Sequence, residues 1–131
     1  MADAAFLVDN GIAYIVGLVD TTDAVKYVAW GTGATGAAAA DTAMETAAAP
    51  TNATAGTGTL AKDTTNTTDD TLVVTHTITA GGALAITEVG VVDNATISGA
   101  TCGFHGTFSA INVSSGDSIS LTLNTVINQA A

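Results

Sequence analysis

Between residues 69 and 127 the chain consists of short runs in which apolar and polar side chains alternate. This two-residue period is typical of β-strands, because successive side chains point to opposite faces of a sheet. Turn sequences rich in glycine, asparagine, aspartate and serine separate the runs at a spacing of roughly 10–12 residues, which is typical of antiparallel sandwiches and barrels. The pattern therefore predicts an all-β fold, an antiparallel β-sandwich.

Three of these runs predict which side chains share a face. They are DDTLVVTHTIT (69–79), LAITEVGVVD (84–93) and SISLTLNTVI (118–127). Apolar and Thr/Ser faces alternate, so we expect each sheet to have one covered face and one wetter face. The predicted sets are Leu72, Val74, His76 and Ile78; Leu84, Ile86, Glu88 and Gly90; and Ile119, Leu121 and Leu123.

The first half of the chain predicts fewer strands. Residues 3–19 carry apolar side chains at helix spacing, which predicts a short helix before a turn at 20–23. The alternating run AVKYVAW (24–30) predicts a strand, and residues 41–49 predict a second short helix that ends before a proline. Residues 51–68 have few large apolar side chains, so they predict a long loop in which GTLAK (58–62) is one short strand.

A chain of 131 residues suggests one domain. We expect a single β-sandwich domain over residues 1–131, with one or two short helices. We also expect an N-terminal helix or arm over residues 1–20 and a small-residue arm over residues 37–68, of which the part over 37–59 can lie on a neighbouring subunit and become ordered there.

The charge balance argues against several classes of partner. The chain contains two lysines, no arginine and twelve acids, with a formal net charge of −10. Nucleic-acid binding depends on Lys and Arg that displace counterions, and anionic membranes attract basic segments. We therefore expect no nucleic acid and no membrane as partners. Residues 1–11 lack the basic start of a secretory signal, and the single Cys102 allows no intrachain disulfide.

Gly31, Gly33 and Gly36 form a G-x-G-x-x-G motif, the spacing of dinucleotide-binding turns. In that fold a helix and a second parallel strand follow, with an acidic residue about 20 positions further on. Here Glu45 comes too early, and the rest of the chain is antiparallel in character. We interpret the glycines as a loop that turns the chain after a strand ending at Trp30, and we expect no nucleotide cofactor.

Residues able to carry chemistry are few. Cys102 and His105 are expected on opposite faces of a strand, which predicts neither a zinc site nor a Cys–His nucleophile pair. His76 alternates with apolar residues and is interpreted as a packed or rim histidine. The loop acids fit solvated turns better than a calcium site, because the chain has no D-x-D-x-D-G loop; they are Asp20, Asp23, Asp69, Asp70 and Asp93. We predict no catalytic, cofactor-binding or metal-binding residue, and no enzyme.

Three segments resemble a family of small phage virion proteins: KYVAWGTGATG (26–36), LAITEVGVVD (84–93) and FSAINVSSGDSISLTLNTVI (108–127). The family pattern runs from an aromatic residue and Trp-Gly-Thr-Gly, through Ile-Thr-Glu-Val/Ala-Gly, to Phe-x-x-Ile-Asn and Gly-Asp before a closing strand. The order is the same here, and the segments cover about a third of the chain. Many members have a basic or bulky residue near the segment ATCGFHGTF (100–108), where this chain has small residues.

Members of this family resemble capsid decoration (cement) proteins or tail and tail-fibre components. The resemblance implies a jelly-roll-like sandwich, often a homotrimer, with no catalytic residues to carry over. We expect a cement protein on the capsid exterior whose partners are the major capsid protein and further copies of itself. The alternative is a tail or tail-fibre component. A carbohydrate-binding module, from another class, would need exposed aromatic side chains on one sheet face, and the chain has six aromatic residues, three of them Phe.

Overall fold

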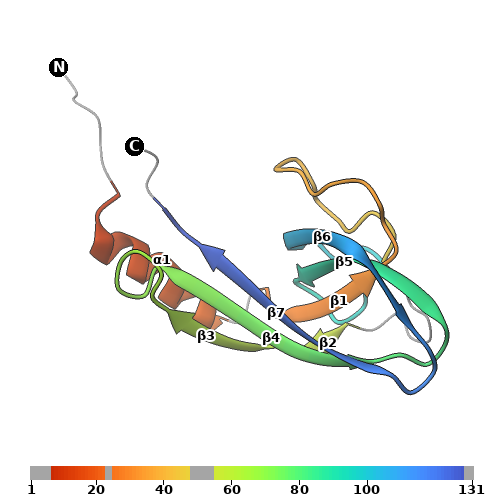
Figure 1. Cartoon of the computed structure of the whole chain (residues 1–131). Helices are drawn as coiled ribbons and strands as arrows, with labels where there is room; N and C mark the ends of the chain where they lie inside the picture. The colour runs from red at the N-terminus through yellow and green to blue at the C-terminus, as the bar shows by residue number, and fades with distance from the viewer. Residues whose placement is uncertain (1–6, 23–24, 48–54, 129–131) are drawn as a thin grey trace.

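The computed structural model describes residues 7–22, 25–47 and 55–128, which form an antiparallel β-sandwich with one short helix (Figure 1). The all-β prediction is therefore confirmed. The elements are α1 (Asp9–Thr22), β1 (Tyr27–Gly31), β2 (Gly56–Thr57), β3 (Thr59–Asp63), β4 (Thr71–Thr79), β5 (Leu84–Val92), β6 (Cys102–Val113) and β7 (Ser118–Val126).

The described strands form two sheets. Sheet 1 has the order β2-β1-β5-β6 and sheet 2 the order β3-β4-β7. The β4–β5 and β6–β7 connections both cross from one sheet to the other, at the same end of the molecule (Figure 1). There the Ala80 N–H donates to the Asp117 carbonyl and the Ala80 carbonyl accepts from the Gly116 N–H, each at 2.7 Å. Gly116 has a φ of 92°, a conformation that favours glycine, so the two connections are joined through a glycine turn.

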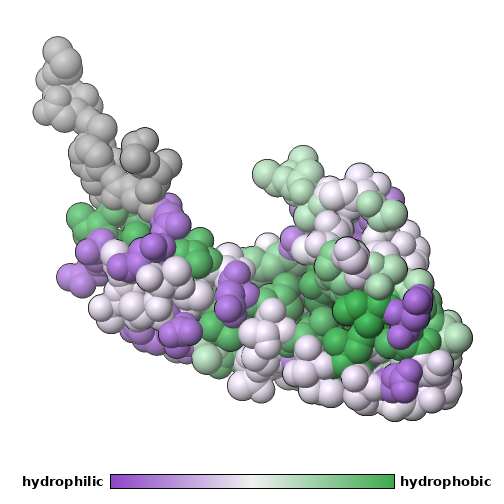
Figure 2. All heavy atoms as spheres, in the orientation of Figure 1, coloured by the Kyte–Doolittle hydropathy of each residue, from purple (hydrophilic) through white to green (hydrophobic). Residues whose placement is uncertain are grey.

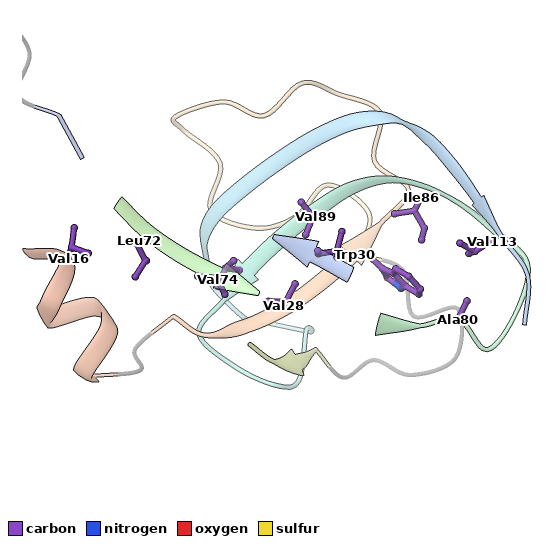
Figure 3. Close-up of a cluster of buried hydrophobic side chains, with 11 residues drawn as sticks. Val16, Val28, Trp30, Leu72, Val74, Ala80, Ile86, Val89 and Val113 are labelled. Carbon is purple, nitrogen blue, oxygen red and sulfur yellow. The ribbon is translucent and has the colours of Figure 1, made fainter. Parts of the chain in front are cut away.

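The main hydrophobic core lies between the sheets and extends to α1 (Figure 3). Removing these side chains from water is the principal favourable contribution to folding. The predicted inward faces of 69–79 and 118–127 are confirmed, because their apolar residues belong to this core or pack against it. The buried members are Val16, Val28, Trp30, Leu72, Val74, Ala80, Ile86, Val89, Val91, Val113 and Leu121.

A second, smaller core covers the outer face of sheet 1. Its buried members are Ala29, Met44, Ala55, Val92, Ala100 and Cys102. Met44 belongs to the loop of residues 32–46, which folds back onto the strands. The helix predicted over 41–49 is wrong for residues 41–47, and residues 48 and 49 lie outside the described residues. The helix propensity of this alanine-rich segment is overridden because its backbone bonds to the sheet, with the Thr42 carbonyl accepting from the Cys102 N–H at 2.9 Å.

Helix α1 packs against the sandwich. It begins at Asp9 and continues to Thr22, so the turn predicted at 20–23 is wrong as far as Thr22. Val16 is fully buried in the main core and Ile12 is buried beside it. Residues 1–6 lie outside the described residues, but α1 itself is an integral part of the domain. Among the described residues, no helix is long and apolar enough to cross a membrane.

The segment predicted as a small-residue arm, 37–68, contributes several parts of the domain. Residues 41–47 lie on sheet 1, and β2 and β3 are edge strands of the two sheets. The strand predicted at 58–62 is confirmed as β3. The turn from Thr64 to Asp70 then leads into β4, and residues 48–54 lie outside the described residues.

Candidate functional site

Glu88 is a fully buried carboxylate in β5, which lies between β1 and β6 in sheet 1. Its Oε1 accepts backbone N–H bonds from Gly33 at 2.9 Å and Thr46 at 2.7 Å. Its Oε2 accepts the Glu45 N–H at 3.0 Å and faces His105 Nε2 at 2.9 Å. A buried carboxylate is tolerated only when its oxygens are bonded, and here each oxygen has two partners.

These bonds fasten the loop of residues 32–46 onto sheet 1 from both of its ends. The hydroxyl of Thr87, the residue before Glu88, donates to the Gly33 carbonyl at 2.6 Å. The Thr32 N–H donates to the Thr46 carbonyl at 3.0 Å, which ties the start of the loop to its end. Further along, Glu45 accepts bonds from the backbone and the hydroxyl of Thr35. The loop is thus held by its backbone, and we call Glu88 together with this loop the Glu88 clamp.

The glycine motif is explained by the clamp. A Cβ at Gly31 would overlap Glu88 Oε1 and the Thr46 carbonyl, and a Cβ at Gly33 would meet Glu88 Oε1 and Glu45, both at 2.7 Å. Only residues without a side chain let the loop approach the carboxylate this closely. At Gly36, by contrast, no atom lies within 4 Å of the added Cβ. The first two glycines are required by Glu88, and the third is not.

The same geometry disfavours a phosphate ligand at this loop. In a dinucleotide site the loop N–H groups point at the pyrophosphate. Here the Gly33 N–H donates to a carboxylate that belongs to the protein itself. That carboxylate occupies the place of the anion and would repel a second one.

His105 connects the clamp to a second carboxylate. Its Nδ1 lies 2.7 Å from Asp41 Oδ2, while its Nε2 faces Glu88. Desolvation lowers the pKa of His105, but the hydrogen bonds to Asp41 and Glu88 and the attraction of their charges outweigh it and raise the pKa overall. The pKa of Asp41 is lowered, chiefly by the Ala38 N–H bond and then by His105. The arrangement therefore favours an imidazolium between two carboxylates.

Cys102 and His105 lie on the same face of β6, so the prediction that they occupy opposite faces is wrong. The register between β5 and β6 shifts by one residue: Val92 pairs with Cys102, whereas Gly90 pairs with His105. The bulge at Gly103 changes the alternation. The Cys102 thiol donates to the Phe104 carbonyl at 3.1 Å, and burial raises its pKa. The two side chains still form no nucleophile pair, because both imidazole nitrogens face carboxylates.

A second shift alters the predicted face of β5. The register changes between Ile86 and Glu88, so Ile86 belongs to the main core while Glu88 points to the outer face of sheet 1. The alternation of the sequence predicts both on one face, and this prediction is wrong. This irregularity separates the carboxylate from the apolar core and directs it toward the loop.

The cluster can hold structure and bind a proton, but its geometry does not suit acid–base catalysis. A general base needs a ring nitrogen within reach of a substrate or of a nucleophile's proton. Both nitrogens of His105 are instead occupied by Asp41 and Glu88, and its side chain is 7% exposed. Among the described residues, no group of His, Cys, Asp and Glu is arranged to hold a metal ion.

A groove of about 540 Å³ lies beside the cluster, between the edges of the two sheets. Residues of β6 and β7 form its walls, the loop around Ala38 forms its rim, and Val89 contributes from β5. In the space-filling view, apolar surface gathers below the overhanging loop (Figure 2). The segment 100–108, which differs from the resembled family, lines part of this groove.

The remaining predicted residues have structural positions. Asp70 is fully buried, and its carboxylate accepts the N–H groups of Thr65, Asn66 and Thr67 and the hydroxyl of Thr71. The Thr65 bond is the main reason why the pKa of Asp70 lies far below its usual value. The interpretation of Asp70 as a solvated turn acid is therefore wrong.

His76 and the other acids are less constrained. His76 is half-buried on β4 and fills the space that a side chain at Gly56 would need, in keeping with a packed histidine. Asp69 has a φ of 59° and pairs with Lys62 at 2.8 Å on the surface. Asp93 bonds the Thr101 N–H at 2.8 Å, and Asp23 lies outside the described residues.

Sequence reasoning missed the meeting of Asp41, Glu88 and His105. One signal was available: a glutamate within the apolar run 84–92 must find buried donors, and glycine loops supply backbone N–H groups. The partner of His105, by contrast, lies 64 residues away in a loop without periodicity.

Comparisons with protein-family models, curated proteins and solved structures found no match to this chain.

Proposed function

We propose that the chain is a phage virion structural protein, a capsid decoration (cement) protein that binds the outside of the head. It would contact the major capsid protein, associate with further copies of itself as a homotrimer, and stabilise the contacts between capsid subunits. Its mechanism is binding: surface buried at subunit junctions favours the assembled particle by mass action.

The observation that carries this proposal is the role of the three family-like segments. Segment 26–36 contributes buried Trp30 and the clamp glycines, and segment 84–93 contributes Glu88. Segment 108–127 contains the turn that joins the two sheets through Asp117. The resembling residues therefore form structural joints. A coat protein needs a rigid fold of this kind, and its binding contacts are then made by other residues on its surface.

The aromatic side chains favour a coat component over a carbohydrate-binding module. Sugar-binding sheets present exposed aromatic rings, which stack on the ligand. Among the described aromatic residues, only Tyr14 is exposed, and it lies on α1. Trp30 is buried, while Tyr27, Phe104 and Phe108 are partly buried. The described part of the sheets thus lacks an aromatic platform.

The test is electron cryomicroscopy of particles produced from the genome that encodes the chain, with the gene intact and with it deleted. We expect additional density on the outer face of the head, at capsid subunit junctions, only when the gene is intact. Purified protein added to the deletion particles should restore this density. The Gly36→Ala protein, added to the deletion particles in the same way, serves as a control. It should restore the same density, because that substitution meets no neighbouring atom.

Density on the tail instead of the head would replace the cement proposal by the tail alternative. Identical particles with and without the gene, and no binding of added protein, would overturn a virion role altogether.

A further inference from the structure

Helix α1 carries apolar side chains around more of its circumference than the domain covers. Val16 belongs to the main core, and Ile12 is buried as well. The described chain has six exposed large hydrophobic residues, and five of them lie on α1 or directly before it; we call these five the α1 stripe. They are Leu7, Val8, Tyr14, Ile15 and Leu18. A helix that is apolar nearly all round is normally buried on more than one side.

The spacing of the stripe suits packing against another helix. On α1, Gly11, Tyr14 and Leu18 follow one another at intervals of three and four residues, which is the spacing of a coiled-coil seam, and Leu7 lies directly before the helix. Leu7 lies on Gly11, since a Cβ there would come within 2.9 Å of Leu7 Cδ1. Tyr14, 69% exposed, stands at the middle of the stripe. The regular seam predicts a helical occupant.

The charges of α1 favour a second copy of this chain as that occupant. At 100° per residue, the helix acids Asp9 and Asp20 are more than 100° around the helix from Tyr14. The stripe itself contains no charged residue. Two copies can therefore meet through their stripes without bringing like charges face to face, although each carries a formal charge of −10.

The exposed area is adequate for self-association. From their exposed fractions, the five side chains present on the order of 500 Å² of apolar surface, most of the ~800 Å² that a stable interface takes from each partner. We propose that α1 packs against α1 of a second copy, with Tyr14 at the centre of the contact. This inference rests on the self-association proposed above and is independent of head binding.

The single buried cysteine makes a direct test possible. Cys102 is buried, so a cysteine placed at position 14 is the accessible one. We expect the Tyr14→Cys protein to form a disulfide-linked dimer under mild oxidation, because position 14 meets its own copy about a symmetry axis. In a trimer, one such bond joins two copies and leaves the third unlinked. Ile111→Cys is the matched control: Ile111 is the exposed large hydrophobic residue outside the stripe and should not cross-link.

Sedimentation of unmodified protein and of lysine variants provides the second measurement. Tyr14→Lys and Ile15→Lys should raise the dissociation constant of self-association by about tenfold or more, while Ile111→Lys should leave it unchanged. Circular dichroism should show that the two stripe variants and the Ile111→Lys control are all folded. Raising the salt concentration should strengthen association of the unmodified protein, because screening reduces repulsion between acidic copies.

Three results would overturn the inference. A wild-type chain that stays monomeric at high concentration removes the self-association itself. An oligomer that survives Tyr14→Lys, without cross-linking at position 14, places the contact elsewhere. Association that weakens with salt indicates a charge-dependent contact and excludes the stripe. Head binding in the microscopy experiment can succeed or fail separately from each of these.

Discussion

His105 faces acidic groups from two directions, and its proton therefore affects stability. Asp41 lies on the loop side and Glu88 on β5, and Glu45 adds a weaker attraction; the Cys102 thiol lies on the same face. Because the folded-state pKa of His105 is raised, its contribution to stability is fully present below the unfolded pKa of about 6.5. The contribution is lost as pH rises through the folded value.

We therefore expect the free energy of unfolding to fall as pH increases from about 6.5 through the raised folded-state pKa of His105. The His105→Gln protein should lack this decrease, whereas His76→Gln should keep it, because His76 has no carboxylate partner among the described residues. Urea unfolding monitored by Trp30 fluorescence at a series of pH values provides the measurement. If the free energy of unfolding of the His105→Gln protein falls with pH as steeply as that of the unmodified protein, another group is responsible.

On the acid side the sign is reversed. The Ala38 N–H bond lowers the pKa of Asp41, and the Thr35 N–H bond lowers the pKa of Glu45. The pKa of Asp70 is lowered more strongly, chiefly by the Thr65 N–H bond. Their contributions are present above the unfolded pKa values, about 4, and are lost as pH falls below them. The free energy of unfolding should therefore be greatest between about pH 4 and about pH 6.5.

The glycines of the clamp offer a comparison within one motif. Gly31→Ala should reduce stability by about 1–3 kcal/mol, because its Cβ would overlap Glu88 and the Thr46 backbone, and core overpacking costs this much. Gly36→Ala should change stability by less than about 0.5 kcal/mol. Denaturation at pH 6 compares them, and limited proteolysis within residues 32–46 reports release of the loop. Equal effects of the two substitutions would contradict the clamp.

At the scale of elements, α1 belongs to the core. Val16→Ala should lower the free energy of unfolding by about 2 kcal/mol through the lost burial and the cavity left behind. Tyr14→Ala, at an exposed position of the same helix, is the matched control and should leave the stability of the monomer nearly unchanged. Thermal unfolding at low protein concentration measures both. A Val16→Ala protein as stable as the control would indicate a helix that is not docked on the sandwich.

The same elements show why the sequence predicts some parts and not others. Strands β4, β5 and β7 were predictable because alternation is local and their turns contain clear signals. Residues 41–47 were assigned to a helix because alanine favours one locally, yet backbone bonds to Glu88 and Cys102 determine their path. The register shifts between β5 and β6 changed the predicted faces, since one or two inserted residues are not visible as a break in composition. The candidate site depends on these non-local contacts, so its residues could not be brought together from the sequence.

At the scale of the whole molecule, the charge distribution leads to a prediction about attachment. The chain has two basic residues, and the Lys62–Asp69 pair on the surface contributes little to binding or stability. If the chain is a cement protein as proposed, its attachment to purified heads should rest on apolar and backbone contacts. At about 1 M salt, where the screening length is about 3 Å, most of the protein should remain bound. Sedimentation of the particles followed by gel electrophoresis measures retention, and complete release by salt alone would point to an ionic contact.

The pairing of strands that are distant in sequence also affects how the chain reaches its structure. Because β4 pairs with β7 and β1 pairs with β5, partners such as Val28 and Val91 or Thr75 and Thr122 are far apart in sequence. Large loops must close before these pairs form, so folding kinetics should be slow, in the range of milliseconds to seconds. During that interval strands such as β4 are unpaired and prone to aggregate, and we expect the formal charge of −10 on each chain to keep the chains apart until the sheets close.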